Sequence, residues 1–157
     1  MTKTALSQRG VPTANDVPTP ESYGALCVCH AMRKTARAVT RRYEKALKPL
    51  GISAGQHSIL AVLNDGRRLP MGALAAALGM DRTTLTRDLK PLQRKGLVAD
   101  DVHPDDRRVR VLKITEAGHA LVIEALPLWQ AAQRDSFDRL KTPDWDALRD
   151  RLEALSE

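Results

Sequence analysis

The stretch LAAALGMDRTTLTRDLKPLQRKGLVADDVHPDDRRVRVLKIT, from Leu74 to Thr115, decides the fold. Its first part predicts a short helix over residues 71–78, a turn at Gly79, and a second helix that begins after the N-cap residue Asp81. Two helices joined by so short a turn are typical of a helix-turn-helix. The buried face of the second helix is formed by leucines at helical spacing, Leu85, Leu89 and Leu92.

The second part of the stretch predicts a β-hairpin. Apolar segments at residues 97–99 and 109–114 flank the turn HPDDRR, and Leu69 to Met71 suggests a further short edge strand. A hairpin directly after a helix-turn-helix is a wing, so we expect a mainly α-helical chain with a small β-hairpin wing, a winged helix-turn-helix. We also expect Pro91 to kink the second helix or to weaken its last turn.

The polar face of the second helix is suited to reading the major groove of DNA. Such a helix places its N-terminal residues at the base edges, where threonine and arginine side chains contact bases or phosphates. The alternative is a polar face that is simply solvated. The candidate DNA-binding residues on this face are Arg82, Thr83, Thr84, Thr86, Arg87 and Lys90.

The turn of the hairpin favours DNA binding over a solvated surface. Its tip is expected to face the flanking minor groove, where an arginine meets a strong negative potential. Asp106 stands two residues before Arg108, so its carboxylate is placed to pair with the guanidinium and to fix its rotamer. We therefore predict that Asp106 orients Arg108 and that Arg108 inserts, while Arg107 and Arg110 meet phosphates.

The composition agrees with an anionic partner. The chain has 157 residues, 43% of them hydrophobic, and carries a net charge of +6 with a pI of about 9.7. This charge favours nucleic acid first and an acidic membrane surface second. No window approaches the roughly 18 apolar residues of a membrane span. Residues 1–20 contain no apolar run of a signal peptide, so we expect a flexible tail on a cytoplasmic protein with no membrane partner.

Amphipathic helices are predicted on both sides of the winged core. Residues 21–52 and 115–157 carry apolar stripes that must be buried somewhere, so we expect them to form a helical dimerisation region. The DNA-binding domain is then residues 53–114, which opens with the capping box Ser53 to Gln56. Pro127 is expected to bend the long helix that follows. A two-fold dimer presents two recognition helices about 34 Å apart, one turn of DNA.

At these residues the chain resembles the MarR family of bacterial transcription regulators. The resemblance covers about residues 22–156. It rests on two stretches, GISAGQHSIL (residues 51–60) and the quoted stretch extended to Gly118. Three motifs within the second stretch are the most specific: the wing pair Asp106 and Arg108, the GLV after the recognition helix, and the ITEAG that opens the next helix. The resemblance implies a homodimer with interlocked terminal helices, a palindromic double-stranded DNA operator, and repression relieved by an effector.

Two kinds of effector stay open. The family's small-molecule pocket implies a small aromatic carboxylate or phenol as ligand, and the candidate lining residues are Met32, Arg33, His57 and Trp129. The resemblance also places Cys29 where the organic-hydroperoxide sensors keep their reactive cysteine, with Tyr43 on a tyrosine that those sensors use. Ala54 stands at the position where those sensors are expected to have a second tyrosine. Cys27 is the other redox candidate, and a small buried Cys29 without redox role is the alternative.

Other classes of protein are less well supported. An enzyme is not expected, because the sequence shows no Gly-rich phosphate loop and no nucleophile elbow, and nothing orients a Cys29–His pair. A metal site at Cys27, His30 and His57 has too few convergent ligands, so we expect no metal and no cofactor. An architectural DNA-binding protein without an effector is the remote alternative, and it would show little preference for sequence.

Overall fold

The computed structural model describes residues 19–20, 23, 27–103, 105–141 and 144–155. The predicted flexible tail, residues 1–20, lies outside these ranges except for its last two residues. The chain divides into two compact units, residues 1–41 and 42–157. Helix α2 (Val28–Leu47) begins in the first unit and ends in the second. No helix in the described part of the chain is long and apolar enough to cross a membrane.

The first unit consists, in its described part, of the N-terminal two-thirds of α2 and the few residues before it. Cys27 caps this helix, because its sulfur accepts the backbone N–H of His30 at 3.4 Å. Most of the α2 side chains up to Arg41 are exposed within the chain, and the first turn contains no acidic residue. Cys29 and Met32, two residues of the apolar stripe predicted for residues 21–52, are exposed within the chain.

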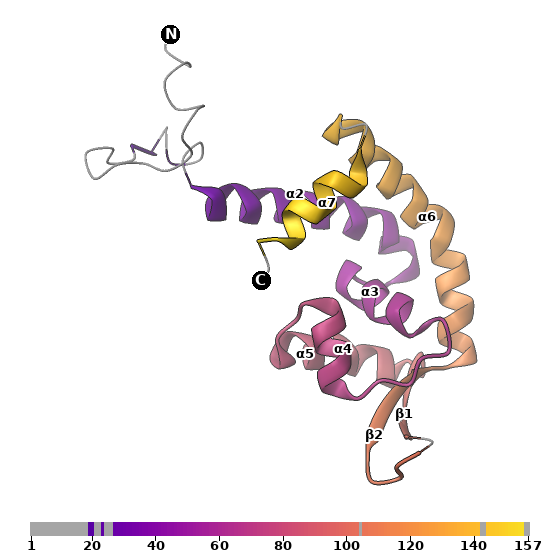
Figure 1. The fold of residues 1–157 in the computed structure, drawn as a ribbon. Coiled ribbons are helices and arrows are strands. Elements are labelled where there is room, and N and C mark those ends of the chain that lie inside the picture. The colour runs from indigo at the N-terminus through magenta and orange to yellow at the C-terminus, as the bar shows by residue number, and fades with distance from the viewer. Residues whose placement is uncertain (1–18, 21–22, 24–26, 104, 142–143, 156–157) are drawn as a thin grey trace. The chain divides into compact units, whose positions relative to one another are not determined.

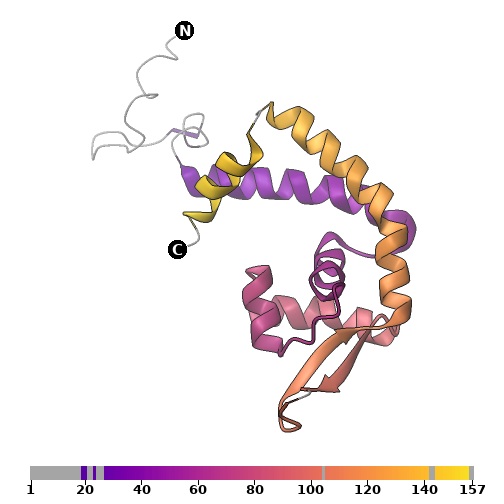
Figure 2. The same ribbon diagram turned by 45° about the vertical axis from the view of Figure 1, so that its right-hand side comes forward.

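The second unit contains the remaining elements (Figures 1 and 2). In chain order they are η1 (Lys48–Leu50), α3 (Ala54–Leu63), α4 (Met71–Leu78), α5 (Arg82–Arg94), β1 (Val98–Val102), β2 (Arg110–Ile114), α6 (Glu116–Leu140) and α7 (Trp145–Glu153). Helices α3, α4 and α5 contact one another, and the hairpin β1–β2 extends from their base. This is the predicted winged helix-turn-helix.

A leucine-rich core holds these elements together. The leucines predicted on the inner face of α5 are buried, with Leu85 and Leu92 at 0% exposure and Leu89 at 2%. They pack with apolar side chains of α3 and α4, and the apolar area removed from water supplies most of the stabilisation. The other fully buried large side chains of the core include Leu47, Ile59, Leu60, Leu63 and Leu74.

The helix boundaries follow the capping signals in the sequence. Ser53 forms the predicted capping box: its hydroxyl accepts the N–H of Gln56, and the Gln56 side chain accepts the N–H of Ser53. Helix α4 ends at Gly79, whose φ of 59° is the left-handed conformation that glycine adopts without strain. Helix α5 continues through Pro91 to Arg94, so the proline removes one hydrogen bond without ending the helix.

The wing is a two-stranded antiparallel sheet whose register pairs Val98 with Ile114 and Val102 with Arg110. The segment before α4 adds a single bridge between Leu69 and Leu112, with N–H···O distances of 2.8 and 3.1 Å. The expected edge strand is therefore one bridge long. Helix α6 begins after Thr115, whose hydroxyl accepts the N–H of Gly118. Its ribbon curves along its length (Figure 2), although it is continuous through Pro127.

Candidate nucleic-acid interface

The N-terminus of helix α5 is fixed by a side-chain cap. The Asp81 carboxylate accepts the backbone N–H of Thr84 at 2.8 Å and the Thr84 hydroxyl at 2.7 Å. These hydrogen bonds, that from the Thr84 backbone first, lower the pKa of Asp81, so the cap is charged at neutral pH. The Thr84 hydroxyl thus has a partner within the helix, and Thr84 lies outside the groove described next.

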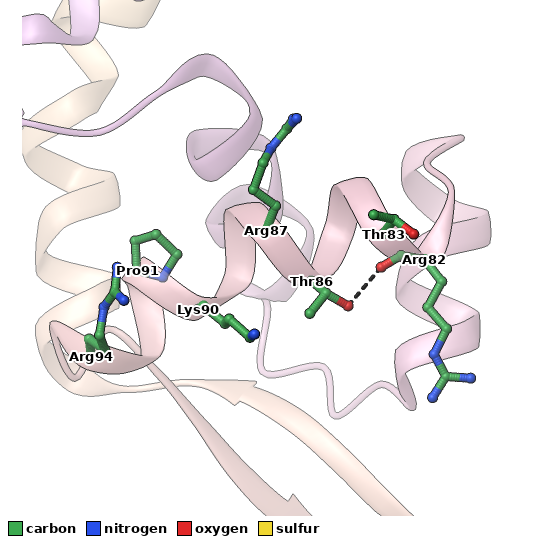
Figure 3. Close-up of a pocket in the computed structure, with 7 residues that line it drawn as sticks. All are labelled: Arg82, Thr83, Thr86, Arg87, Lys90, Pro91 and Arg94. Atoms are coloured by element: carbon green, nitrogen blue, oxygen red, sulfur yellow. Dashed lines mark hydrogen bonds between the residues drawn. The ribbon is translucent and has the colours of Figure 1, made fainter.

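The solvent-facing side of α5 forms an open basic groove (Figure 3). Its lining contains four cationic side chains and no acidic one; the residues are Arg82, Thr83, Thr86, Arg87, Lys90, Pro91 and Arg94. Five of the six predicted contact residues of this helix are brought together here, all but Thr84. The opposite side of the helix is the buried leucine face, so this groove is the surface that α5 presents to solvent.

Pro91 and Arg94 are lining residues that the sequence reasoning missed. A helix advances about 100° per residue, so Arg94, eleven residues after Thr83, lies within roughly 20° of it on the helix surface. That periodicity could have identified Arg94. Helix α5 remains helical to Arg94, although Pro91 was expected to kink it or to weaken its last turn.

The threonine and arginine side chains in the middle of α5 differ in their partners. The Thr86 hydroxyl donates to the backbone oxygen of Arg82 at 2.7 Å. Among the described residues, no intramolecular hydrogen bond involves the Thr83 hydroxyl. Arg87 has an exposed side chain whose Nε lies 3.3 Å from Asp88 Oδ1, and this leaves the terminal nitrogens of its guanidinium directed to solvent.

The wing tip contains the predicted pair of Asp106 and Arg108. The Asp106 Oδ1 accepts the backbone N–H of Arg108 at 3.0 Å and its Nε at 3.1 Å, while Oδ2 lies 3.4 Å from Nη2. The Arg108 side chain bond is the main reason why the pKa of Asp106 is lowered. The Arg108 side chain is 92% exposed, so the pair holds a guanidinium in solvent in one orientation. Arg107 and Arg110 are exposed beside it.

A second acidic residue, Asp101, links the two strands of the wing through ion pairs and hydrogen bonds. Asp101 Oδ2 lies 2.8 Å from the Nζ of Lys113 and 3.2 Å from Nη1 of Arg68, and Oδ1 accepts the N–H of Val102. The hydrogen bond from Lys113 is the largest cause of the lowered pKa of Asp101. The network joins both wing strands to the segment before α4. It was not predicted, because it depends on the register of the hairpin, which places Asp101 diagonally across from Lys113.

The predicted effector residues are only partly brought together. His57 of α3 is buried, and its ring is stacked on that of Trp129 of α6, with centroids 6.5 Å apart and an interplanar angle of 18°. Burial lowers the pKa of His57, so the ring is neutral at neutral pH. Met32 and Arg33 belong to the first unit and are exposed there. The Tyr43 hydroxyl donates to the side-chain oxygen of Gln133 in α6.

The two cysteines have different surroundings. Cys29 is exposed, whereas Cys27 is half-buried at the N-terminus of α2. The His30 N–H and then a hydrogen bond with Tyr23 lower the pKa of the Cys27 thiol, which favours the thiolate. Within the described part of the chain, no three His, Cys, Asp or Glu side chains are placed to hold a metal ion.

Comparisons with known proteins agree with this geometry. A family model described as MarR family matches residues 50–109, which run from η1 to the wing tip. The transcriptional regulator MosR of M. tuberculosis, in a complex with DNA, is 35% identical, with a TM-score of 0.71, over 83% of this chain and 93% of that one. CouR from Rhodococcus jostii RHA1, bound to p-coumaroyl-CoA, is 26% identical, with a TM-score of 0.72, over 82% and 91%. The organic hydroperoxide resistance transcriptional regulator of Bacillus subtilis is 27% identical over 101 residues, 64% of this chain and 69% of that protein.

Proposed function

Because the chain belongs to the MarR family of winged-helix DNA-binding transcriptional regulators, we propose that it is a homodimeric repressor of a palindromic operator. The relatives are transcriptional regulators and not enzymes. The observation that carries the proposal is the basic groove of α5, which contains four cations and no acid and lies on the same unit as the Arg108 wing. In this proposal α5 enters the major groove and reads base edges, while Arg108 enters the flanking minor groove.

The orientation of Arg108 supports its role in the minor groove. A free surface arginine loses rotamer freedom when it binds, which costs about 0.5–1.5 kcal/mol. Asp106 has already restricted this side chain through its contacts with the backbone and guanidinium nitrogens, although Arg108 is almost fully exposed. The two carboxylate contacts leave Nη1 of the guanidinium uncommitted to Asp106 and available for a groove acceptor.

Exposed apolar side chains support the homodimer. Ile123 of α6 is 59% exposed and Leu155, just after α7, is 64% exposed, and further large apolar side chains of α6 and α7 are exposed as well, Leu126, Leu140, Trp145 and Leu152. Such clusters on helices outside the core are buried efficiently by a second copy related by a two-fold axis. The axis would also give the operator its palindromic symmetry.

We further propose that a small aromatic ligand releases the repressor by binding near His57 and Trp129. The stacked pair joins α3, which contacts the recognition helix, to α6, which carries exposed apolar residues. A ligand there would act on both the DNA-reading and the dimerising elements. CouR, a relative, has a structure bound to p-coumaroyl-CoA.

A thiol switch is the second candidate. The observation that favours it is the N-cap position of Cys27, where the His30 N–H and Tyr23 lower the thiol pKa. Cys29 is exposed and so accessible to an oxidant. One relative is named for organic hydroperoxide resistance. Oxidation at the N-terminus of α2 would change a helix that continues into the second unit.

The first experiment measures binding of the reduced protein to the DNA upstream of its own coding sequence, at fixed salt and against random duplex. We expect a specificity ratio of about 10³ or more, the lower end for specific regulators. Arg108→Ala should weaken specific binding by about tenfold or more without changing the thermal unfolding curve. Arg134→Ala is the control: it removes the same charge from an exposed position on α6 and should leave specific binding unchanged. A ratio near one would instead support the architectural DNA-binding class.

The same assay separates the two effectors. Organic hydroperoxide added to the wild type and to the Cys27→Ser and Cys29→Ser variants tests the thiol switch. Aromatic carboxylates and phenols added to the wild type and to Trp129→Leu test the ligand site. Release by peroxide that one serine variant abolishes identifies the reactive cysteine. Release by an aromatic acid that Trp129→Leu abolishes supports the ligand site at His57 and Trp129.

A further inference from the structure

The three threonines of the sequence TTLT in α5 differ in the hydrogen bonds of their hydroxyl groups, and the difference bears on the proposed reading of DNA. The Thr84 hydroxyl is bonded to the cap residue Asp81 and lies outside the groove. The Thr86 hydroxyl donates to the backbone oxygen of Arg82, one turn earlier, although the Thr86 side chain lines the groove (Figure 3). The polar atom of Thr86 is thus directed along its own helix.

The bond from Thr86 to Arg82 fixes the position of the threonine methyl group. The Oγ1 and Cγ2 atoms share one Cβ, so holding the hydroxyl on the Arg82 oxygen selects one staggered rotamer and places Cγ2 in a single position. At a distance of 2.7 Å this is a well-formed hydrogen bond. The hydroxyl can still accept a hydrogen bond but has no donor left, so Thr86 cannot donate to a base, and it offers the groove a methyl group in a fixed position.

We propose that the Thr86 methyl packs on the C5 methyl of a thymine, and so selects a thymine in each operator half-site. The inference rests on the proposed function, because it requires α5 to lie in the major groove. There thymine is the only one of the four bases that presents a methyl group. Arg82 and Lys90, one turn before and after Thr86, are placed on the same side of the helix (Figure 3) and bring cations to the flanking phosphates.

The test replaces single thymines of the DNA by deoxyuridine, which lacks only the C5 methyl group. The DNA is a duplex that the wild-type protein enriches from a random pool. Removal of one buried methyl contact is expected to weaken binding about fourfold, the equivalent of about 0.8 kcal/mol per methyl group. We expect this loss at one thymine position in each half-site. Wild-type protein that tolerates deoxyuridine at every position overturns the inference.

Two variants assign the effect to the Thr86 methyl group. Thr86→Ser keeps the hydroxyl and removes the methyl, so it should bind the thymine and deoxyuridine duplexes equally. Thr86→Val keeps the methyl and removes the hydroxyl, so it should still prefer thymine. The matched control is Thr83→Ser, which removes a methyl from the neighbouring groove threonine and should leave the preference at that position intact.

The outcomes separate this inference from the function on which it rests. Discrimination that survives in Thr86→Ser, or that disappears in Thr86→Val, shows that another group reads the base and overturns the inference while specific binding persists. Wild-type protein that enriches no sequence at all overturns the proposed function, and the inference with it. Thermal unfolding of each variant, monitored by circular dichroism, establishes that the compared proteins are equally folded.

Discussion

At the wing tip, the proposed contact with DNA gives a single carboxylate two opposing effects on affinity. In that contact Asp106 brings a negative charge close to the phosphates, which by itself weakens binding. It also holds Arg108 in one orientation through hydrogen bonds of 3.0 and 3.1 Å. If orientation is the larger effect, Asp106→Ala weakens operator binding, by about twofold to tenfold from the rotamer entropy that Arg108 then loses on binding. If simple charge is the larger effect, the same change strengthens binding.

We predict the weaker binding, and titration of operator DNA followed by fluorescence anisotropy at fixed salt decides the sign. Asp105→Ala is the matched control, because it removes an adjacent exposed carboxylate that has no bond to Arg108 among those described. Asp105→Ala should leave affinity unchanged or raise it slightly. Unfolding temperatures of both variants should stay close to the wild-type value, since an exposed ion pair contributes at most about 1 kcal/mol.

Gly118 occupies a position at the start of α6 where a side chain has no room. A Cβ atom there would lie 2.2 Å from the backbone oxygen of Leu97 and 2.7 Å from Cγ1 of Ile114. A backbone oxygen cannot move aside cheaply, so Gly118→Ala should separate α6 from the wing base and lower the free energy of unfolding by about 1–3 kcal/mol.

Urea denaturation measures this loss, and Gly72 offers the matched control. Gly72 is in helix α4, and a Cβ atom at this position meets nothing within 4 Å. Gly72→Ala should therefore leave stability unchanged or raise it by up to about 1 kcal/mol, because alanine is the better helix former. A Gly118→Ala variant as stable as the wild type would contradict the close approach of α6 to Leu97.

At the scale of elements, the packing of α3 against α6 makes stability depend on pH. His57 is buried on α3 against Trp129, and burial lowers its pKa below the usual value of about 6.5. Between the folded and unfolded pKa values, the unfolded chain binds a proton that the folded chain does not. The free energy of unfolding should therefore be independent of this group above pH 6.5 and decrease as the pH falls below it.

Urea unfolding between pH 8 and pH 5 tests this expectation. The decrease attributed to His57 should be absent in His57→Gln and retained in His103→Gln, whose histidine lies at the wing. The carboxylates with lowered pKa values, Asp81, Asp101, Asp106 and Asp135, lose their contribution only at more acidic pH, below their ordinary value of 3.8. An identical slope in the wild type and His57→Gln would contradict the prediction.

Local signals in the sequence were sufficient to predict most of these elements. The cap residues Ser53 and Asp81 begin α3 and α5 as expected, and Thr115 begins α6, because each side chain accepts a backbone N–H of the first turn. The spacing of Leu85 and Leu89 identified the buried face of α5, and therefore also its solvent-facing side. Both kinds of signal act within one helix and need no tertiary information.

Features that depend on side-chain rotamers or on partners elsewhere in the chain were not predicted. The Thr84 hydroxyl bonds to the cap residue Asp81, and the Thr86 hydroxyl bonds to the backbone oxygen of Arg82. Both bonds depend on side-chain rotamers, which the residue types do not specify. The Asp101 network with Arg68 and Lys113 requires the register of the wing. The apolar stripe of residues 21–52 was predicted to contribute to a dimer, and the surface that covers it would then belong to a second copy of the chain.

At the scale of the whole chain, a cationic surface on α5 is separated from a surface on α7 where charges neutralise one another. The lining of the α5 groove is entirely cationic or neutral. On α7, by contrast, the Arg149 guanidinium lies within 4 Å of the carboxylates of Asp146, Asp150 and Glu153. The helix therefore neutralises much of its own charge, and its exposed apolar residues Trp145 and Leu152 stand on a surface suited to association with a protein and not with DNA.

This separation predicts that dimerisation and base reading can be uncoupled. The double variant Leu152→Asp with Leu155→Asp places two charges where apolar side chains are exposed, and should convert a dimer of the 17.3 kDa chain into a monomer in sedimentation equilibrium. The double variant should bind a full palindromic duplex at least about tenfold more weakly than the wild type, because the second half-site is no longer engaged by a linked domain.

A duplex with one half-site should bind both proteins alike, since the α5 groove is unchanged. Arg151→Asp, a charge reversal at an exposed polar position of the same helix, is the control and should remain dimeric. A double variant that stays dimeric would place the dimer interface elsewhere, and a wild-type protein that sediments as a monomer would contradict the proposed homodimer.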